Sequence, residues 1–349
     1  MNAGHPSGTD GGPFVLHAPN VHVGGGKSLL LTLLAALTAP AVVLLDTRLA
    51  PLPDLPDGIT VLRFPPTLLG RLRAERALAR HARTASAVLC FGNLPPALDT
   101  PRGKVSVFLQ NRYLLPGAAL SGLPLRTRLR LAVERAWLRH RLGDCRLIVQ
   151  SQTMADAALA AFGRPAAIHP FAATATEPAG PAGAAQQVDF LYVASGEAHK
   201  NHATLLQAWA HMAAEGLTPS LGLTLGAGDR ARLDANLRRA ALAGADIRMF
   251  DPRPPAEMGA LMSSARAAIY PSLFESFGLP LIEAARAGLP ILASERDYVR
   301  DVVDPVETFD PTSSRSIARA VRRFLDAPPQ PRPPILDAQR FLATVRGGP

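Results

Sequence analysis

Short apolar runs alternate with longer amphipathic stretches throughout the first half of the chain. The runs have the length of strands, and the stretches between them carry apolar residues at helical spacing. Strands separated by helices imply parallel βαβ units, so this half is predicted to fold as one α/β domain. Strands are expected at 14–18, 41–45, 60–64, 87–91, 105–109 and 146–151, and helices from about 28, at 68–83 and at 124–141.

The second half repeats the alternation and is predicted to form a second doubly wound sheet. Its strands are expected at 189–195, 221–226, 246–250, 266–272 and 289–294, and its helices near 202–214, 229–243, 255–264, 280–287 and 313–325. The stretch "PFAATATEPAGPAGAAQQ" before it is low in large apolar residues and rich in Pro, Gly and Ala. That is the composition of a linker.

These patterns divide the chain into two domains. The N-terminal domain is predicted to cover 13–170, the linker 171–187 and the C-terminal domain 188–326. Residues 1–12 are polar and glycine-rich without the layout of a secretory signal, so we expect them to be disordered. Residues 327–349 are expected to form a tail, with a helix that returns to the N-terminal domain as one option.

One apolar segment, from Leu29 to Leu45, approaches the length of a membrane span. It is slightly too short and is interrupted by "TAP", so a buried helix followed by a buried strand explains it better. The two cysteines, Cys90 and Cys145, have the spacing of neither a disulfide framework nor a metal site. We therefore expect a cytoplasmic protein without a zinc site.

Positive charge is concentrated in two arginine-rich stretches. The formal net charge is +9, and arginines are dense at 63–83 and at 126–146. In "RTRLRLAVERAWLRHRLGDCR" leucine, valine and Trp137 alternate with the arginines, as in a helix with arginines on several faces. Such a helix suits peripheral contact with an anionic membrane, and a simple solvated helix is an equal alternative. Nucleic acid is not an expected partner, because no recognisable binding module accompanies the charge.

The segment "VHVGGGKS" at 21–28 has the Lys-Ser pair of a phosphate-binding P-loop, and Asp46 at a later strand end is a candidate magnesium ligand. The P-loop pattern needs a glycine where this chain has Val21, because that residue opens the loop whose N–H groups wrap the phosphates. A P-loop NTPase is therefore kept only as a minor alternative.

Two glutamates frame the strongest signal, "PSLFESFGLPLIEAARAGLPILAS" at 271–294. A strand ends at Ser272, a loop carries Glu275, and a helix begins near Leu279 with Glu283 about one turn inside it. Backbone N–H groups between the glutamates and the positive helix end can bind an anion. A sugar nucleotide needs this layout, with hydroxyl acceptors at each end and an anion site between them. Two surface glutamates around a glycine turn are the alternative.

Residues 271–294 resemble the Glu-x7-Glu region of retaining glycosyltransferases of family four, which have the GT-B fold of two Rossmann-like domains facing across a cleft. The resemblance implies that Glu275 contacts the donor sugar and that Glu283 binds the nucleotide ribose. It also implies that backbone amides between them contact the sugar and the diphosphate. These donor-binding residues are Ser276, Phe277, Gly278 and Leu279.

The segment "FLYVASGEAHKNHATLLQAW" at 190–209 resembles the first strand, loop and helix of the family's donor domain. The resemblance makes Lys200 the ligand of the diphosphate. An arginine that is common near the start of this loop is missing, because the chain has "ASGE" there. Either a subgroup of the family manages without it or an arginine from elsewhere replaces it.

The same family offers an explanation for the three glycines. In it, the first strand leads to a glycine-rich loop that opens a helix and faces the donor phosphates and the acceptor, and "HAPNVHVGGGKSLLL" is similar. Gly24, Gly25 and Gly26 are then donor-binding through their backbone, and Lys27 lies on the helix surface. Asn111 follows a strand where many relatives have a histidine that touches the sugar, so it is assigned a catalytic role.

Together these features predict a retaining, metal-independent hexosyltransferase with Glu275, Lys200 and Asn111 as catalytic residues. It is expected to move a sugar from a nucleotide-diphosphate sugar to an acceptor hydroxyl without any cofactor. The expected acceptor is a glycan or lipid-linked glycan of cell-surface polysaccharide or lipopolysaccharide assembly, at the inner face of the membrane. Because of the missing arginine, a GT-B-like protein that binds a nucleotide or glycan without turnover is the main alternative.

Overall fold

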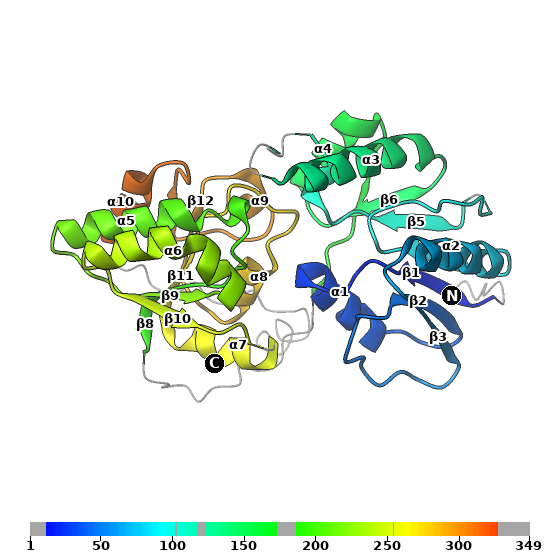
Figure 1. Ribbon diagram of the computed structural model, residues 1–349, viewed down its shortest axis with the longest axis horizontal. Helices are drawn as coiled ribbons and strands as arrows, with labels where there is room; N and C mark the ends of the chain where they lie inside the picture. Colours follow the sequence, from blue (N-terminus) through cyan, green and yellow to red (C-terminus); the bar gives the residue numbers. More distant parts are fainter. Residues whose placement is uncertain are drawn as a thin grey trace, which may run out of the picture. The chain divides into compact units, whose positions relative to one another are not determined.

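The structure is a computed structural model that describes residues 12–101, 103–116, 120, 123–172, 186–253 and 255–326. The predictions for the disordered N-terminus, for most of the linker and for the tail at 327–349 lie outside the described residues. Contacts divide the chain into two compact units, Met1–Ala173 and Thr174–Pro349 (Figure 1). Each unit is described by itself.

The N-terminal unit contains, in its described residues, a seven-stranded sheet with the order β3-β2-β1-β4-β5-β6-β7. All pairings are parallel, and the direction of winding reverses between β1 and β4, as in doubly wound nucleotide-binding folds. The strands are β1 (Phe14–Ala18), β2 (Ala41–Asp46), β3 (Ile59–Phe64), β4 (Ala87–Cys90), β5 (Val105–Phe108), β6 (Arg146–Val149) and β7 (Ala167–Ile168). The helices are α1 (Gly24–Ala35), α2 (Leu68–Ala82), η1 (Arg112–Leu114), α3 (Leu125–Arg141) and α4 (Gln152–Phe162).

The C-terminal unit repeats this topology in a six-stranded parallel sheet of its described residues, with the order β10-β9-β8-β11-β12-β13. Here the winding reverses between β8 and β11. The strands are β8 (Val188–Tyr192), β9 (Leu221–Thr224), β10 (Ile247–Phe250), β11 (Ala265–Tyr270), β12 (Ile291–Ser294) and β13 (Glu307–Phe309). The helices are η2 (Ala198–Lys200), α5 (His202–Ala214), α6 (Ala227–Leu242), α7 (Pro255–Ser263), α8 (Leu279–Arg286), α9 (Asp297–Arg300) and α10 (Ser314–Asp326).

The apolar segment from Leu29 to Leu45 is the end of α1 followed by most of β2, as predicted. All six residues of β2 are buried, because helices cover a parallel sheet on both faces, and this explains its uninterrupted apolar run. Within the described residues no helix combines the length and the hydropathy that crossing a membrane requires.

Helix α1 begins at Gly24, four residues before the predicted start. The glycines therefore form the first turn of the helix and do not lie in a loop before it, with Val23 as the N-cap. Gly24 has a φ of 66°, which side chains other than glycine rarely adopt. The backbone of this turn is consequently unobstructed by any Cβ atom where the chain leaves β1.

Helix α4 was not predicted, although its signals are present in the sequence. The hydroxyl of Ser151 caps it by accepting a hydrogen bond from the Met154 N–H (3.3 Å), and Gly163 ends it in the left-handed conformation. The elements β7, α9 and β13, which were also missed, have two to four residues. Such short segments carry no measurable periodicity.

Trp209 of α5 lies at the centre of the C-terminal core and is 1% exposed. Its ring meets Phe190 edge-on, with centroids 5.6 Å apart, and its indole N–H donates to the Pro219 carbonyl (2.8 Å). Phe190 in turn contacts Phe324 of α10, with centroids 5.7 Å apart. The tryptophan therefore connects the sheet to two helices.

We expect Trp209→Ala to lower the free energy of unfolding of the C-terminal unit by about 3–5 kcal/mol, because it leaves a large cavity and an unpaired carbonyl. Urea unfolding followed by circular dichroism measures the change. Trp137 on α3 is only half-buried, so Trp137→Ala is the matched control and should cost clearly less. Equal losses for both variants would contradict this account of the core.

Candidate functional site

The predicted donor residues gather where the C-terminal sheet changes direction. Strands β8 and β11 are neighbours, and the chain leaves β8 towards β9 but leaves β11 towards β12. Loops that diverge in this way open a crevice at the carboxyl ends of the strands, where α/β folds bind ligands. Lys200 follows β8 and Glu275 follows β11, so the topology brings together residues 75 positions apart.

Lys200 and Glu275 form a largely buried ion pair. Lys200 Nζ donates to Glu275 Oε1 at 2.6 Å, and the side chains are 13% and 11% exposed. The Tyr270 hydroxyl donates to the same oxygen at 3.1 Å, and Lys200 Nζ lies 5.9 Å from the centre of the Tyr270 ring. A buried charge is tolerated only when it is paired and hydrogen-bonded, and both conditions are met here.

Asn201 ties the loop after β8 to the loop after β11. Its side-chain amide donates to the carbonyls of Pro271 (3.1 Å) and Pro311 (2.7 Å), while its Oδ1 accepts from the Thr204 hydroxyl (2.6 Å). Its φ of 61° lies in the left-handed region, which asparagine tolerates better than most residues. This conformation turns the chain from Lys200 directly into α5.

Two buried tyrosines hold the same loops at Ser272. The Tyr192 hydroxyl donates to the Lys200 carbonyl (2.8 Å) and lies 3.0 Å from the Ser272 hydroxyl, which then acts as donor to it. The Tyr298 hydroxyl donates to the Ser272 carbonyl (2.8 Å). Burial raises the pKa of Tyr192 and of Tyr270 well above the ordinary value, so these hydroxyls stay protonated and able to donate.

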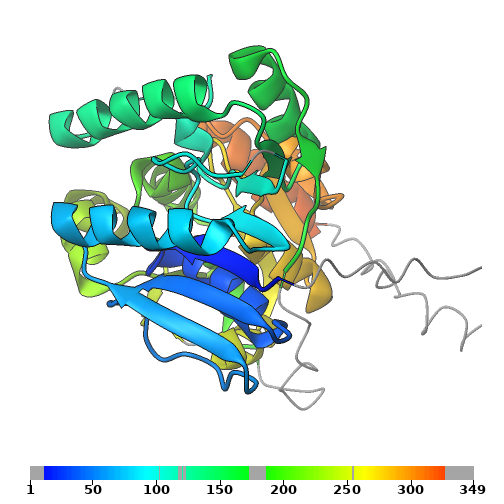
Figure 2. The same cartoon turned by 90° about the vertical axis from the view of Figure 1, so that its right-hand side faces the viewer.

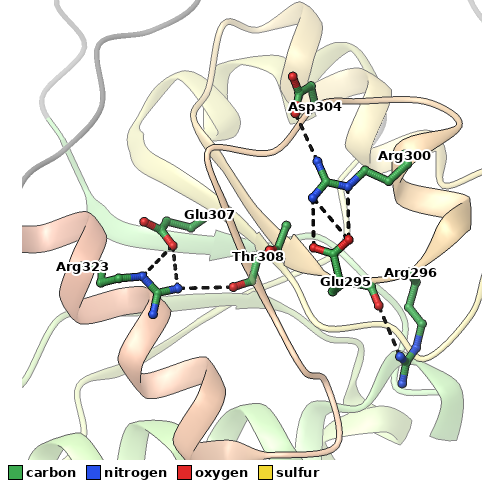
Figure 3. A network of polar contacts seen from close by, with 7 residues as sticks. All are labelled: Glu295, Arg296, Arg300, Asp304, Glu307, Thr308 and Arg323. Carbon is green, nitrogen blue, oxygen red and sulfur yellow. Dashed lines mark hydrogen bonds and ion pairs between the residues drawn. The ribbon is translucent and has the colours of Figure 1, made fainter.

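Tyr298 lies on α9, which surface ion pairs anchor (Figure 3). Arg300 of α9 binds both carboxylate oxygens of Glu295 and reaches Asp304, while Arg323 of α10 binds Glu307 of β13 at 2.6 Å. Exposed pairs of this kind contribute about 0–1 kcal/mol each. Their effect here is to fix the short helix behind the Ser272 loop.

The turn into α8 has the form that the sequence predicts. Gly278 is the N-cap with a φ of 76°, and Pro280 stands in the first turn, where its missing N–H costs nothing. Phe277 is buried, while the Glu283 side chain is exposed one turn along the helix. Desolvation nevertheless raises the pKa of Glu283, and the charge of Arg286 opposes the rise.

A second set of predicted residues gathers in the N-terminal unit. A Cβ atom on Gly26 would lie 3.4 Å from Gln110 Oε1, so the glycine turn and the end of β5 are close together. Asn93, in the left-handed conformation, accepts hydrogen bonds from the N–H groups of Gln110 (2.6 Å) and Asn111 (2.8 Å). Asn111 Oδ1 caps η1 by accepting from the Tyr113 N–H (3.1 Å), a structural role that the sequence did not indicate. Its catalytic role stays a prediction.

The residues of the P-loop alternative have other partners. The carboxylate of Asp46 is fully buried and accepts bonds from Arg48 Nε (2.9 Å) and Nη2 (2.7 Å), and Lys27 Nζ donates to the Ala50 carbonyl (3.0 Å). Among the described residues, no three His, Cys, Asp or Glu side chains gather as they would around a metal ion. These contacts favour a structural role for both Asp46 and Lys27.

The loop that lacks the family's arginine has an acidic neighbour. The Gly196 N–H donates to Asp229 Oδ2 (2.9 Å), and Arg232 contacts the other oxygen of the same carboxylate. A guanidinium from α6 therefore reaches this loop. The sequence gave no signal for Asp229, Arg232 or the tyrosines, which have the pattern of ordinary helix and strand residues.

Comparison with known proteins identifies the C-terminal half. The family model described as "Glycosyl transferases group 1" matches residues 178–340. The C-terminal unit is a glycosyl transferases group 1 domain. The fold is GT-B: the Anabaena Alr3699/HepE crystal structure in complex with UDP-glucose superposes with a TM-score of 0.65 over 90% of both chains, at 18% identity.

Two curated glycosyltransferases match shorter segments of this chain. The MMP alpha-(1->4)-mannosyltransferase of Mycolicibacterium hassiacum is 37% identical over 76 residues, 21% of this chain and 18% of its own length. The O-antigen chain mannosyltransferase B of Escherichia coli is 31% identical over 102 residues, 29% of this chain and 24% of its own length. The matches thus span less than a quarter of each relative.

His202, next to the site, generates a prediction about pH. It is 2% exposed, packs on Tyr192 with ring centroids 4.8 Å apart, and neither ring nitrogen has a hydrogen-bond partner among the described residues. Burial, with a contribution from the Lys200 charge, lowers its pKa from 6.5 to about 4. The unfolded chain therefore takes up a proton below pH 6.5 that the folded unit resists until about pH 4.

We expect this difference to remove about 2 kcal/mol of unfolding free energy between pH 7 and pH 5. The stabilisation is fully present above pH 6.5 and is lost as the pH falls towards 4. Urea unfolding of wild type and His202→Phe at both pH values isolates the effect, because phenylalanine keeps the packing without titrating. An unchanged difference between the two pH values in the variant would contradict the assignment.

Proposed function

We propose that this protein is a retaining, metal-independent glycosyltransferase that moves a hexose from a nucleotide-diphosphate sugar to an acceptor hydroxyl. The observation that carries the proposal is the Lys200–Glu275 pair at the switch point of a glycosyl transferases group 1 domain. It places one cation and one carboxylate beside a helix N-terminus, as a diphosphate linked to a sugar requires.

In this proposal the donor exchanges partners with the ion pair. The diphosphate binds Lys200, which leaves Glu275 free to accept a hydroxyl of the sugar, while the first-turn amides of α8 receive the phosphate oxygens. Lys200 and the helix then stabilise the negative charge that grows on the leaving diphosphate, which is usually the largest catalytic contribution. Arg232 is placed to supply the second cation through its contact at the Gly196 loop.

The names of the relatives support the choice of donor and acceptor. Two of them are called mannosyltransferases, one acting on the O-antigen chain, and the solved neighbour binds UDP-glucose. We propose a nucleotide-linked hexose as donor and a glycan or lipid-linked glycan of cell-surface polysaccharide or lipopolysaccharide assembly as acceptor. A protein that binds the donor without turnover is the second candidate, because the loop lacks the family's arginine.

A thermal-shift panel of GDP-, UDP-, dTDP- and ADP-sugars, starting with GDP-mannose and UDP-glucose, tests the donor. A ligand at a hundred times its Kd adds about 2.7 kcal/mol of stability, which is readily measured. Release of nucleoside diphosphate with and without acceptor then separates a transferase from a binding protein. Turnover that disappears in EDTA would contradict the metal-independent proposal.

We expect Glu283→Ala to weaken binding of nucleoside diphosphate and of nucleotide sugar alike, because Glu283 is proposed to hold the ribose. Glu275→Ala and Glu275→Gln should mainly lower kcat, because Glu275 faces the sugar. Glutamine keeps the hydrogen bonds to Lys200 and Tyr270 as far as an uncharged group can, so it separates chemistry from the stability lost by leaving Lys200 unpaired. Equal losses of bare nucleotide affinity in the Glu275 and Glu283 variants would contradict the assignment.

We expect Lys200→Ala to lower kcat/KM by about ten- to a hundredfold, because a charged hydrogen bond to phosphate contributes about 1.5–3 kcal/mol. Lys27→Ala is the matched control: its ammonium group donates to the Ala50 carbonyl, so the variant should remain active. Initial rates at several donor concentrations measure both. Loss of activity in Lys27→Ala with near-normal activity in Lys200→Ala would place the phosphate site in the N-terminal unit and revive the P-loop alternative.

A further inference from the structure

Helix α3 presents a row of large apolar side chains to solvent. Leu125, Leu129 and Val133 recur every four residues and are 78%, 66% and 60% exposed. On the opposite side of the same helix, Leu131 and Leu138 are 1% and 0% exposed and pack into the N-terminal core. The exposed row is therefore not the face that holds α3 on its own unit, and the fold does not account for it.

Arginines border the exposed row on both sides. At 100° per residue, Arg126 and Arg130 follow one edge of the row, and Arg128 and Arg139 follow the other. All four side chains are exposed. An apolar stripe between two basic rows is the pattern of a helix that lies in the plane of a lipid interface, where the stripe enters the acyl boundary and the cations meet the head groups.

Helix α2 extends this surface. Its first residues Leu68, Leu69 and Leu72 are 89%, 55% and 42% exposed. The crossovers that contain α2 and α3 run in the same direction along the strand order, so both helices cover the same face of the sheet (Figure 2). The two are close enough that the charge of Arg71 on α2 acts on the pKa of Glu134 on α3.

We propose that α3, with the first turns of α2, docks flat on an anionic phospholipid surface. Charge complementarity selects this occupant: a second copy facing the same surface would bring arginine rows against arginine rows. The tail at 327–349 is also a poor match, because it carries three arginines and one aspartate, a net charge of +2. Anionic head groups satisfy the arginines while the leucines enter the apolar layer, and the long arginine stems reach outward past them.

Sedimentation of the full chain with vesicles tests the proposal independently of any transferase activity. Phosphatidylcholine mixed with phosphatidylglycerol is compared with phosphatidylcholine alone. Leu125→Gln/Leu129→Gln/Val133→Gln should weaken binding to the mixed vesicles about tenfold or more, because binding scales with the apolar area inserted. Arg126→Gln/Arg128→Gln should weaken it by about fivefold per arginine.

The controls lie on α6 of the C-terminal unit. Leu242 is 90% exposed, so Leu242→Gln removes an equally accessible apolar side chain, and Arg238→Gln/Arg239→Gln removes two exposed charges from a helix without the stripe. Both control variants should bind vesicles like wild type. Unchanged circular dichroism and Tm in every variant show that the fold is intact, as expected for substitutions at exposed positions.

Four outcomes would overturn the proposal. The first is no binding to the mixed vesicles at low salt, and the second is equal binding to pure phosphatidylcholine, which would remove the role of charge. The third is wild-type binding by the triple apolar variant, which would reduce the surface to a charge patch. The fourth is a different occupant: a dimer that the triple variant dissociates, or vesicle binding only after truncation behind Asp326.

Discussion

The buried ion pair between Lys200 and Glu275 is the interaction on which the rest of the candidate site depends. Two charges removed from water are stable only if each satisfies the other and further hydrogen bonds complete the shell. Glu275 meets this condition with the Tyr270 hydroxyl at 3.1 Å, and Lys200 has the face of the same ring nearby. A pair held in this way is preorganised, so an anion that displaces Glu275 from Lys200 finds the cation already in position.

The pair requires that two loops from different strands keep a fixed separation. Asn201 spans from the first loop to the carbonyl of Pro271, and Tyr192 and Tyr298 meet at Ser272. These groups are neutral over the physiological range, because burial keeps the tyrosine hydroxyls protonated. The support is therefore insensitive to the charge of the ligand, and the part of the site that responds electrostatically is limited to the ion pair and the end of α8.

Sequence patterns predicted both sheets, because buried parallel strands have long apolar runs and their crossovers have helical spacing. The Glu-x7-Glu segment and Lys200 were likewise found, since the motif fixes a turn at Gly278 and a helix behind it. The first turn of α1 was misplaced because three glycines argue against a helix, although a φ of 66° at Gly24 makes them suitable there. The Tyr270 and Asp229 contacts could not be predicted, because they depend on tertiary proximity across strands and leave no periodicity.

Helix α3 shows where periodicity fails for a different reason. Its sequence has apolar residues on two opposite sides, one packed at Leu131 and Leu138 and the other exposed at Leu125 and Leu129. Opposite apolar sides cancel in any measure of one-sidedness, so the helix has the pattern of a solvated segment with arginines on several faces. Only the burial of one side in the folded unit separates the two rows and shows that the other remains unpaired. The inserted area and the flanking charge then act together, because each arginine beside the row is held at the depth where anionic head groups lie.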